Sequence, residues 1–204
     1  MTFSPYEKIS SDDIYGCAAS AVIVNDKKQV LLLMRDDYPV WVNIGGLVDP
    51  GENFEQAMHR ETMEESHLKV RVVREGGEYF TALSPPLKGY MHEKLYYCIP
   101  ADDKQVARLG NDGVRVEWFD IDKLPANIPP SCRMRIEETF YNRPASTYAG
   151  ITMPDMRAFA ATLKPEQIYG YEMWKAHPKV IAKQAKANPS RLPRSSGGQN
   201  PPGF

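Results

Sequence analysis

The chain has 204 residues, of which 42% are hydrophobic and 25% are charged, a composition typical of a globular protein with one main core and an appendage. Its three cysteines lie far apart, which excludes a disulfide framework and paired metal-binding cysteines. No apolar run approaches the roughly 18 to 20 residues of a membrane span, and the polar N-terminus lacks the pattern of a signal peptide. We therefore expect a cytoplasmic protein with no membrane partner.

The formal net charge of −1 at pH 7 conceals an uneven distribution of charge. Residues 1–150 carry 17 Lys and Arg against 23 Asp and Glu, a net charge of −6, whereas residues 151–204 carry 8 against 3, a net charge of +5. A basic C-terminal segment of this kind can contact nucleic acid, an anionic ligand or the acidic body of its own protein.

The first predicted elements are strands that lead into glycines. Residues 17–24 and 29–36 are apolar runs separated by the turn sequence NDKK, and we predict that they form a β-hairpin. Residues 41–44 have the composition of a short strand and continue directly into Gly45 and Gly46.

The remainder of the chain predicts further strands, then helices. Residues 69–75, 94–100 and 113–121 have the composition of strands, and in the last of them valines and aromatic residues alternate with polar ones. Predicted helices cover residues 129–142, the segment after a capping box at Thr152–Asp155, and residues 177–187. From Asn188 onward the chain is so rich in Pro, Gly and Ser that we expect disorder. These elements describe a mixed β-sheet with inserted helices.

Between these strands lies an acidic segment that we predict to be a helix starting at the N-cap Asn53. At about 100° per residue, its inward stripe contains both apolar and acidic side chains. The apolar members are Phe54, Ala57, Met58 and Leu68, and the acidic members are Glu61, Glu64 and Glu65. The predicted outward side contains Glu55, Gln56, His59 and Ser66.

Carboxylates on an inward stripe need a positive partner. Like charges at i,i+3 and i,i+4 spacings repel, and half-buried carboxylates without partners are unstable. Clustered carboxylate oxygens without His or Cys suit Mg²⁺, whose remaining ligands are typically water and phosphate oxygens. The glycines before the helix, Gly45, Gly46 and Gly51, allow the backbone to approach a ligand closely and to offer a carbonyl to a metal.

The spacing of these residues resembles the Nudix box. Gly46 is followed after five residues by Glu52, after seven more by Arg60-Glu61, and after two more by Glu64-Glu65. Two positions depart from the family pattern. Thr62 replaces the usual bulky aliphatic residue, and we expect it still to pack. His67 replaces the usual helix-ending glycine, so it must adopt a strained cap or end the helix differently.

The resemblance implies an α+β fold, an α/β/α sandwich with a mixed β-sheet, plus a C-terminal helical extension. We predict a Nudix domain at residues 1–145, the helical extension at 146–188 and a disordered tail at 189–204. The implied activity is hydrolysis of the diphosphate linkage of a small-molecule nucleoside diphosphate derivative. Its implied cofactor is Mg²⁺, for which Mn²⁺ can substitute.

Site residues follow from the same resemblance. The predicted metal ligands are Gly45, Glu61, Glu64, Glu65 and Glu117, and the predicted catalytic residues are Arg60, Glu61, Glu64 and Glu117. Arg60 should pair with Glu52. Gly46 and Asn127 are predicted to bind substrate, with Asn127 contacting a nucleobase. The alternatives are an exposed strand glutamate for Glu117 and a turn residue for Asn127.

Several functional alternatives stay open. The substrate is a nucleoside triphosphate, ADP-ribose or a nucleotide sugar. The protein is otherwise a nucleotide-sensing module that does not hydrolyse its ligand, or a hydrolase of capped RNA. In the RNA hypothesis the backbone is bound by basic residues of the C-terminal segment, Lys175, Lys179, Lys183, Lys186, Arg191 and Arg194, although a solvated helix face also explains them. Homodimerisation is left open.

Overall fold

The computed structural model describes residues 9–83, 88–145 and 156–187, in which seven strands form two sheets. The larger sheet has the order β4-β1-β6-β5, with β4 at Ile44–Leu47, β1 at Ile14–Ile23, β6 at Tyr90–Pro100 and β5 at Val70–Ala82. The smaller sheet has the order β3-β2-β7, with β3 at Trp41–Val42, β2 at Gln29–Met34 and β7 at Arg115–Asp120. Strands β1 and β6 are parallel and the other pairs are antiparallel. The predicted mixed β-structure is therefore confirmed.

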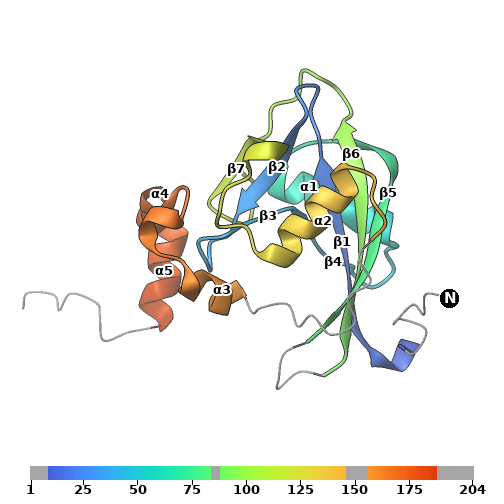
Figure 1. Ribbon diagram of the computed structural model, residues 1–204, viewed down its shortest axis with the longest axis horizontal. Coiled ribbons are helices and arrows are strands. Elements are labelled where there is room, and N and C mark those ends of the chain that lie inside the picture. Colours follow the sequence, from blue (N-terminus) through green and yellow to red (C-terminus); the bar gives the residue numbers. More distant parts are fainter. Residues whose placement is uncertain (1–8, 84–87, 146–155, 188–204) are drawn as a thin grey trace, which may run out of the picture.

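The predicted hairpin of β1 and β2 is wrong. The two segments share one isolated bridge, Val24 to Val30, and then diverge into different sheets (Figure 1). Strand β1 is hydrogen-bonded on its two edges by β4 and β6, and β2 by β3 and β7. No free edge remains for hairpin pairing, which the turn sequence alone could not reveal.

The remaining strands occur where the sequence predicts them, with altered ends. The predicted strand at residues 41–44 divides at Asn43, so that β3 joins the smaller sheet and β4 the larger one. Strands β5 and β6 are longer than predicted because their pairing continues past an irregularity between Glu75 and Glu78. The added length contains polar residues that contact each other across the two strands, such as His92 and Glu78, whose Nε2 and Oε1 atoms are 2.8 Å apart.

Two helices cover opposite faces of the larger sheet. Helix α1 (Phe54–Ser66) contacts the even-numbered side of β6, where Cys98 Sγ lies 3.9 Å from Met58 Sδ. Helix α2 (Pro130–Phe140) contacts the odd-numbered side, where Arg135 pairs with Glu93. Figure 1 shows α2 in front of the sheet and α1 behind it. This arrangement is the predicted α/β/α sandwich.

The described part of the C-terminal segment is helical and packs on the smaller sheet. It contains α3 (Met156–Thr162), the short 3-10 helix η4 (Pro165–Gln167), α4 (Tyr171–Ala176) and α5 (Pro178–Ala187). Its buried residues are Ile168, Trp174 and Val180. The sequence predicts α3 and α5 but misses α4, and both the capping box at residues 152–155 and the tail from residue 188 lie outside the described residues.

Two indole hydrogen bonds fasten this extension to the domain. Trp174 Nε1 donates to the Arg35 carbonyl at 2.8 Å, and Trp41 Nε1 donates to the Tyr169 carbonyl at 3.1 Å. Among the described helices none combines the length and the apolar character that a bilayer crossing requires. The three cysteines are free thiols, as predicted.

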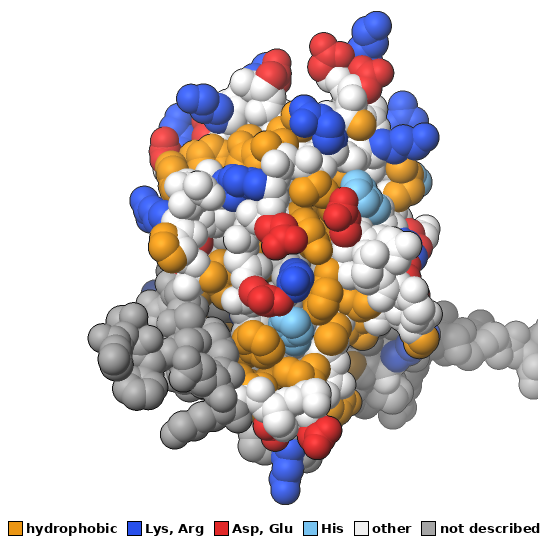
Figure 2. All heavy atoms as spheres, turned by 90° about the vertical axis from the view of Figure 1, so that its right-hand side faces the viewer, with side chains coloured by type: hydrophobic (Ala, Val, Ile, Leu, Met, Phe, Trp, Pro, Cys, Tyr) orange, Lys and Arg blue, Asp and Glu red, His pale blue; other side chains and the backbone are white. Residues whose placement is uncertain are grey.

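The surface around β5 carries both signs of charge. On the face in Figure 2, acidic, basic and histidine side chains are interspersed along an apolar band. Strand β5 alternates accordingly, with Arg71, Val73 and Glu75 exposed and Val70 buried. The described residues of this face therefore form no continuous basic stripe for a nucleic-acid backbone (Figure 2).

Candidate active site

The acidic helix begins as the sequence predicts. Asn53 Oδ1 accepts the backbone N–H of Gln56 at 2.9 Å, and Gln56 Oε1 accepts the backbone N–H of Asn53 at 2.9 Å. This reciprocal capping box satisfies two N–H groups that the first turn leaves free. It also fixes the angle at which α1 leaves the glycine-containing loop.

The buried side of α1 largely matches the prediction. Ala57 and Met58 have no exposed surface, and Thr62 is also fully buried, which confirms that it packs in place of a larger aliphatic residue. The prediction for Ser66 is wrong: it is fully buried, and its hydroxyl donates to the Thr62 carbonyl at 2.6 Å. Glu55 is exposed as predicted.

The three predicted carboxylate ligands form a gradient of exposure from the sheet to solvent. Glu65 is 7% exposed, whereas the side chains of Glu61 and Glu64 are 14% and 46% exposed. Glu65 Oε2 accepts the backbone N–H of Gly45 at 3.0 Å. A Cβ atom on Gly46 would lie 2.4 Å from Glu61 Oε1. Gly46 therefore has no room for a side chain beside the Glu61 carboxylate, whereas a Cβ atom on Gly45 would meet Ser20 and the Ala19 carbonyl of β1.

Burial makes this site costly for charged carboxylates. It raises the pKa of Glu65 to about 8, with further increases from the charges of Glu61 and Asp112, against the opposing effect of the Gly45 N–H. Burial also raises the pKa of Glu61, although its partner Arg60 acts in the opposite direction. The nearby positive groups thus do not fully compensate the negative charge of the clustered carboxylates. A site of this kind favours the binding of a cation.

Arg60 links the loop before α1 to the acids on it. Its Nε and Nη2 atoms donate to the two carboxylate oxygens of Glu52, at 2.9 Å each, and Nη1 donates to Glu61 Oε1 at 2.7 Å. Nη2 also donates to the Leu47 carbonyl at 2.8 Å. The predicted pairing of Arg60 with Glu52 is therefore present. The fork of the guanidinium group joins strand, loop and helix at one point.

His67 ends α1 in the left-handed conformation that glycine usually adopts. Its φ and ψ angles are 55° and 21°, and its backbone N–H donates to the Met63 carbonyl. A non-glycine residue in this conformation stores about 1 kcal/mol of strain. The strain stays local, because α1 remains regular through Ser66.

The loop between β6 and β7 completes the C-terminal end of α1. Backbone N–H groups of Arg108, Gly110 and Asn111 donate to the carbonyls of Ser66, Glu65 and Glu64 at 2.9, 3.0 and 2.9 Å. These carbonyls lack partners within the helix. A Cβ atom on Gly110 would lie 1.7 Å from the Glu64 carbonyl oxygen, so only glycine allows this close approach.

This loop brings Asp112, a residue not predicted from the sequence, close enough to α1 for its charge to act on Glu61 and Glu65. The negative charge of Asp112 contributes to the raised pKa values of both Glu61 and Glu65, and its side chain is exposed. The sequence signal for Asp112 was its place just before the predicted strand of residues 113–121. The prediction chose Glu117, an acid within that strand, instead.

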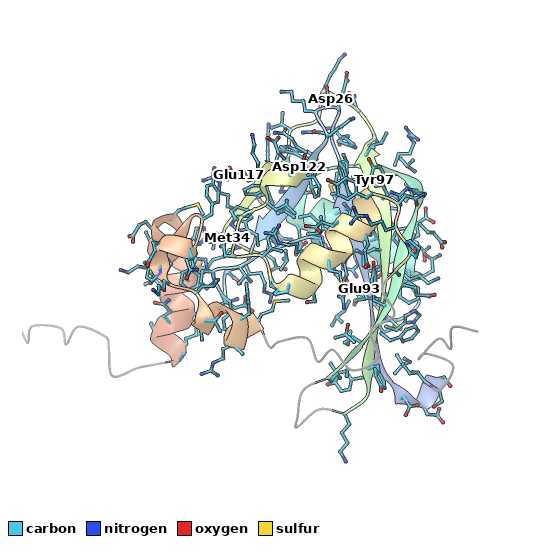
Figure 3. The ribbon with its side chains drawn as sticks, in the orientation of Figure 1. Asp26, Met34, Glu93, Tyr97, Glu117 and Asp122 are labelled. Atoms are coloured by element: carbon cyan, nitrogen blue, oxygen red, sulfur yellow. The ribbon has the colours of Figure 1, made fainter. Side chains whose placement is uncertain are left out.

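Glu117, the predicted distal acid, contacts the C-terminal extension and a neighbour on its own strand. Tyr169 Oη donates to its Oε1 atom at 2.9 Å, and Arg115 Nη2 lies 2.8 Å from its Oε2 atom. Figure 3 shows Glu117 on β7 on the side of the C-terminal helices. These contacts give Glu117 a role in joining β7 to the extension.

Asn127 is also engaged by the extension. It is fully buried, its Nδ2 atom donates to the Pro39 carbonyl at 2.9 Å, and its Oδ1 atom accepts the Tyr169 N–H at 3.2 Å. An amide with no exposed surface and both ends bonded to backbone cannot contact a nucleobase in this conformation. The predicted role is therefore corrected to a structural one.

A cavity of about 280 Å³ opens on the other side of the glycine strand. It lies on the α2 face of the sheet, and its polar lining residues include Ser20, Arg35, Asn43, Glu93 and Arg135. Ser20 Oγ donates to Glu93 Oε1 at 2.7 Å, and Arg135 pairs with the same carboxylate. Figure 3 shows Glu93 on the long strand β6 below α2. Gly45 and Gly46 line the cavity as well, so the strand between cavity and carboxylates carries no side chain there.

The donors around β4 and α1 fit a hard divalent cation by their chemistry. Carboxylate oxygens and a strand carbonyl are the ligands that Mg²⁺ accepts. In the part of the chain that the structure describes, no three His, Cys, Asp or Glu side chains already converge on one point. Glu61 is instead paired with Arg60 and Glu65 with the Gly45 N–H. The residues that would hold the ion are therefore close in the fold, and two of them are bonded to groups of the protein.

Comparison with known proteins places this geometry in a family. The sequence profile of the NUDIX domain matches residues 15–135. A Bacillus subtilis (strain 168) protein named "Putative 8-oxo-dGTP diphosphatase" is 28% identical over 125 residues, which are 61% of this chain and 80% of that protein. A Salmonella paratyphi C (strain RKS4594) protein named "NAD-capped RNA hydrolase NudC" is 29% identical over 131 residues, and the match spans 61% of this chain but only 49% of that protein.

A solved structure supports the fold independently. The MutT protein from Methanosarcina mazei Go1 superposes with a TM-score of 0.53 at 21% sequence identity, covering 65% of this chain and 97% of that one. The matched region in each comparison is smaller than the full chain, which carries the extension described above.

Proposed function

The chain belongs to the NUDIX domain family of hydrolases, and we propose that it is a Mg²⁺-dependent pyrophosphohydrolase that cleaves the diphosphate linkage of a nucleoside diphosphate derivative. One observation carries the proposal: Glu61 and Glu65 are held against the glycine strand with raised pKa values, and the adjoining Arg60 does not offset the cost of their burial. A divalent cation with phosphate ligands supplies the missing positive charge.

In this proposal Glu61, Glu64 and Glu65 hold the metal together with the Gly45 carbonyl. The N–H of Gly45 points to Glu65, and in an extended strand the C=O of the same residue points to the same side. Bound Mg²⁺ supplies charge neutralisation of the diphosphate and orientation of a water molecule. Arg60 keeps Glu61 in place through its contacts with Glu52 and the Leu47 carbonyl.

Asp112 is proposed as the distal acid, in the role that was predicted for Glu117. The attacking water must lose a proton as its oxygen bonds to phosphorus. An exposed carboxylate whose charge acts on both Glu61 and Glu65 is placed to accept that proton. Glu64, the most exposed of the three box acids, is the second acid within the same site.

The cavity on the α2 face is proposed to receive the nucleoside part of the substrate. Its volume of about 280 Å³ is close to the lower limit of ordinary small-molecule pockets, roughly 300 Å³, so it suits one nucleobase better than a dinucleotide. The substrate diphosphate then crosses Gly45 and Gly46 toward the carboxylates. Because the relative from Bacillus subtilis is named for a purine nucleoside triphosphate, that class is the first to test.

Two alternatives are less well supported. The sensing hypothesis depended on distortion of α1 by His67, and α1 is regular through Ser66. The capped-RNA hypothesis depended on free lysines, yet Lys179 Nζ donates to the Asn111 carbonyl at 2.6 Å and Lys183 Nζ lies 2.7 Å from Asp36 Oδ1. The acidic body of the protein itself is thus the partner of at least part of the basic segment.

Substrate profiling tests the proposal. The purified full chain with Mg²⁺ or Mn²⁺ should hydrolyse at least one member of a panel that contains purine nucleoside triphosphates, ADP-ribose, nucleotide sugars and capped RNA. The products should be a nucleoside monophosphate and a second phosphate-containing product, which is pyrophosphate when the substrate is a nucleoside triphosphate. Absence of turnover on every diphosphate, with both metals present, would overturn the assignment.

A further inference from the structure

Helix α5 reaches the loop that carries Asp112. Lys179, near the start of α5, donates from Nζ to the Asn111 carbonyl at 2.6 Å and lies 3.5 Å from the Gly113 carbonyl. These two carbonyls flank Asp112 in the sequence. One ammonium group therefore holds the backbone on both sides of the acid.

The same short loop is attached to α1 from its other side. The Asn111 N–H donates to the Glu64 carbonyl at 2.9 Å, and the Val114 N–H donates to the Met34 carbonyl at 2.8 Å. Asn111 thus connects the acidic helix, through its N–H, with the C-terminal extension, through its carbonyl. Gly113, with a φ angle of 74°, provides the turn that lets the loop lie between them.

Lys179 is itself held in a fixed place. Its neighbour Val180 is 1% exposed, and Trp174 in the preceding helix is 7% exposed. One turn further along α5, Lys183 pairs with Asp36. Because buried Val180 and the Lys183 pair already attach α5 to the domain, only the side chain of Lys179 has to be ordered for its ammonium group to reach the loop.

We infer that Lys179 is a positioning residue for the active site: it holds the Asn111–Gly113 backbone beside the C-terminal end of α1 and so fixes where this backbone presents Asp112. The inference rests on the proposed function for its catalytic consequence, but not for the structural coupling. It gives the C-terminal extension a part in the reaction, although none of its described residues lies among the acids of the site.

The structural arm of the test is hydrogen exchange on the full chain. In Lys179→Ala the amide protons of Gly110 and Asn111 should exchange at least about tenfold faster than in the unchanged protein, because their loop loses its attachment to α5. The matched control is Lys186→Ala, the same substitution on the same helix at an exposed lysine, which should leave that exchange unchanged. Equal exchange at residues 108–114 in both variants overturns the inference, whatever the enzyme does.

The kinetic arm separates positioning from general stability. Lys179→Ala should lower kcat about tenfold with little change in KM or Tm, as when an outer contact orients a reacting group. Lys179→Arg, which can still donate to both carbonyls, should restore most of kcat. Lys186→Ala should behave as the unchanged protein.

A double-mutant cycle with Asp112→Asn identifies the path of the effect. If Lys179 acts through Asp112, adding Lys179→Ala to Asp112→Asn should lower kcat no further. Effects that multiply would show that Lys179 acts on something else and would overturn the inference. If the unchanged protein hydrolyses no diphosphate while the exchange result is positive, the proposed function fails and the coupling of α5 to the loop stands.

Discussion

Helices α1 and α5 both carry several like charges at helical spacing, yet they use them in opposite ways. The acids of α1 lie among its apolar residues, and Glu65 is 7% exposed. The lysines of α5 extend from an exposed side to reach a backbone carbonyl and a carboxylate of the domain. A charge pattern therefore indicates a site only when its phase coincides with the buried stripe. Outside that stripe, charge serves attachment.

If the C-terminal extension is attached to the domain, the two should unfold together. Trp174→Ala is the strongest test of this attachment. Removal of a buried tryptophan costs roughly 3 to 5 kcal/mol, and here the indole hydrogen bond to Arg35 would also be lost. We expect one cooperative thermal transition at a clearly lower Tm. Ile181→Ala, at a residue 53% exposed on α5, should change the Tm little. A domain transition that stays in place while the extension melts separately would contradict the attachment.

In the acidic helix α1, Glu64→Gln should abolish most activity with little effect on folding. Its side chain is 46% exposed, so neutralisation costs little stability, whereas loss of one preorganised electrostatic contact typically lowers kcat by about 10²- to 10³-fold. Glu55→Gln, on the exposed side of the same helix, is the matched control. Equal activity of the two variants would place the reaction elsewhere.

Glu65 is the acid of α1 that burial affects most, so the stability of the protein should depend on pH through it. Its folded pKa is about 8 against an ordinary value of 4.5, so its protonated form is favoured by folding. That stabilisation is complete below about pH 4.5 and is lost as the pH rises through about 8. The metal-free protein should therefore lose stability across this range.

Glu65→Gln removes the ionisation and should make the metal-free protein more stable at pH 9, by up to about 5 kcal/mol, since the pKa lies about 3.5 above its ordinary value and one pKa unit corresponds to about 1.4 kcal/mol. The gain should disappear at pH 4.5. Thermal melts of both proteins across pH, with and without MgCl₂, provide the measurement. Bound Mg²⁺ should stabilise the unchanged protein more than the variant, and a gain that is independent of pH would show that the carboxyl is not the cause.

The sequence predicted the part of the site that is local along the chain. Glu61, Glu65 and Gly45 belong to one continuous segment, so helical phase and glycine spacing were sufficient to bring them together. Asp112 and Asn127 depend on contacts between segments far apart in the sequence, namely a loop docked on the end of α1 and an extension docked on β3. No periodicity encodes such docking, so Asp112 was not predicted at all and the role predicted for Asn127 did not take its buried environment into account.

The smallest expected effect separates the two lysines of α5. Lys183 Nζ lies 2.7 Å from Asp36 Oδ1, but the lysine side chain is 54% exposed, and exposed ion pairs contribute about 0 to 1 kcal/mol and weaken with salt. Lys183→Met should lower the free energy of unfolding by less than about 1 kcal/mol at low salt, by nothing measurable near 1 M NaCl, and should leave kcat unchanged. Lys186→Met provides the baseline. Lys183 contacts a side chain of the 35–37 loop, whereas Lys179 contacts the backbone that carries Asp112. A loss of activity from Lys183→Met would therefore mean that the docking of α5 as a whole supports the site, and not the single contact of Lys179.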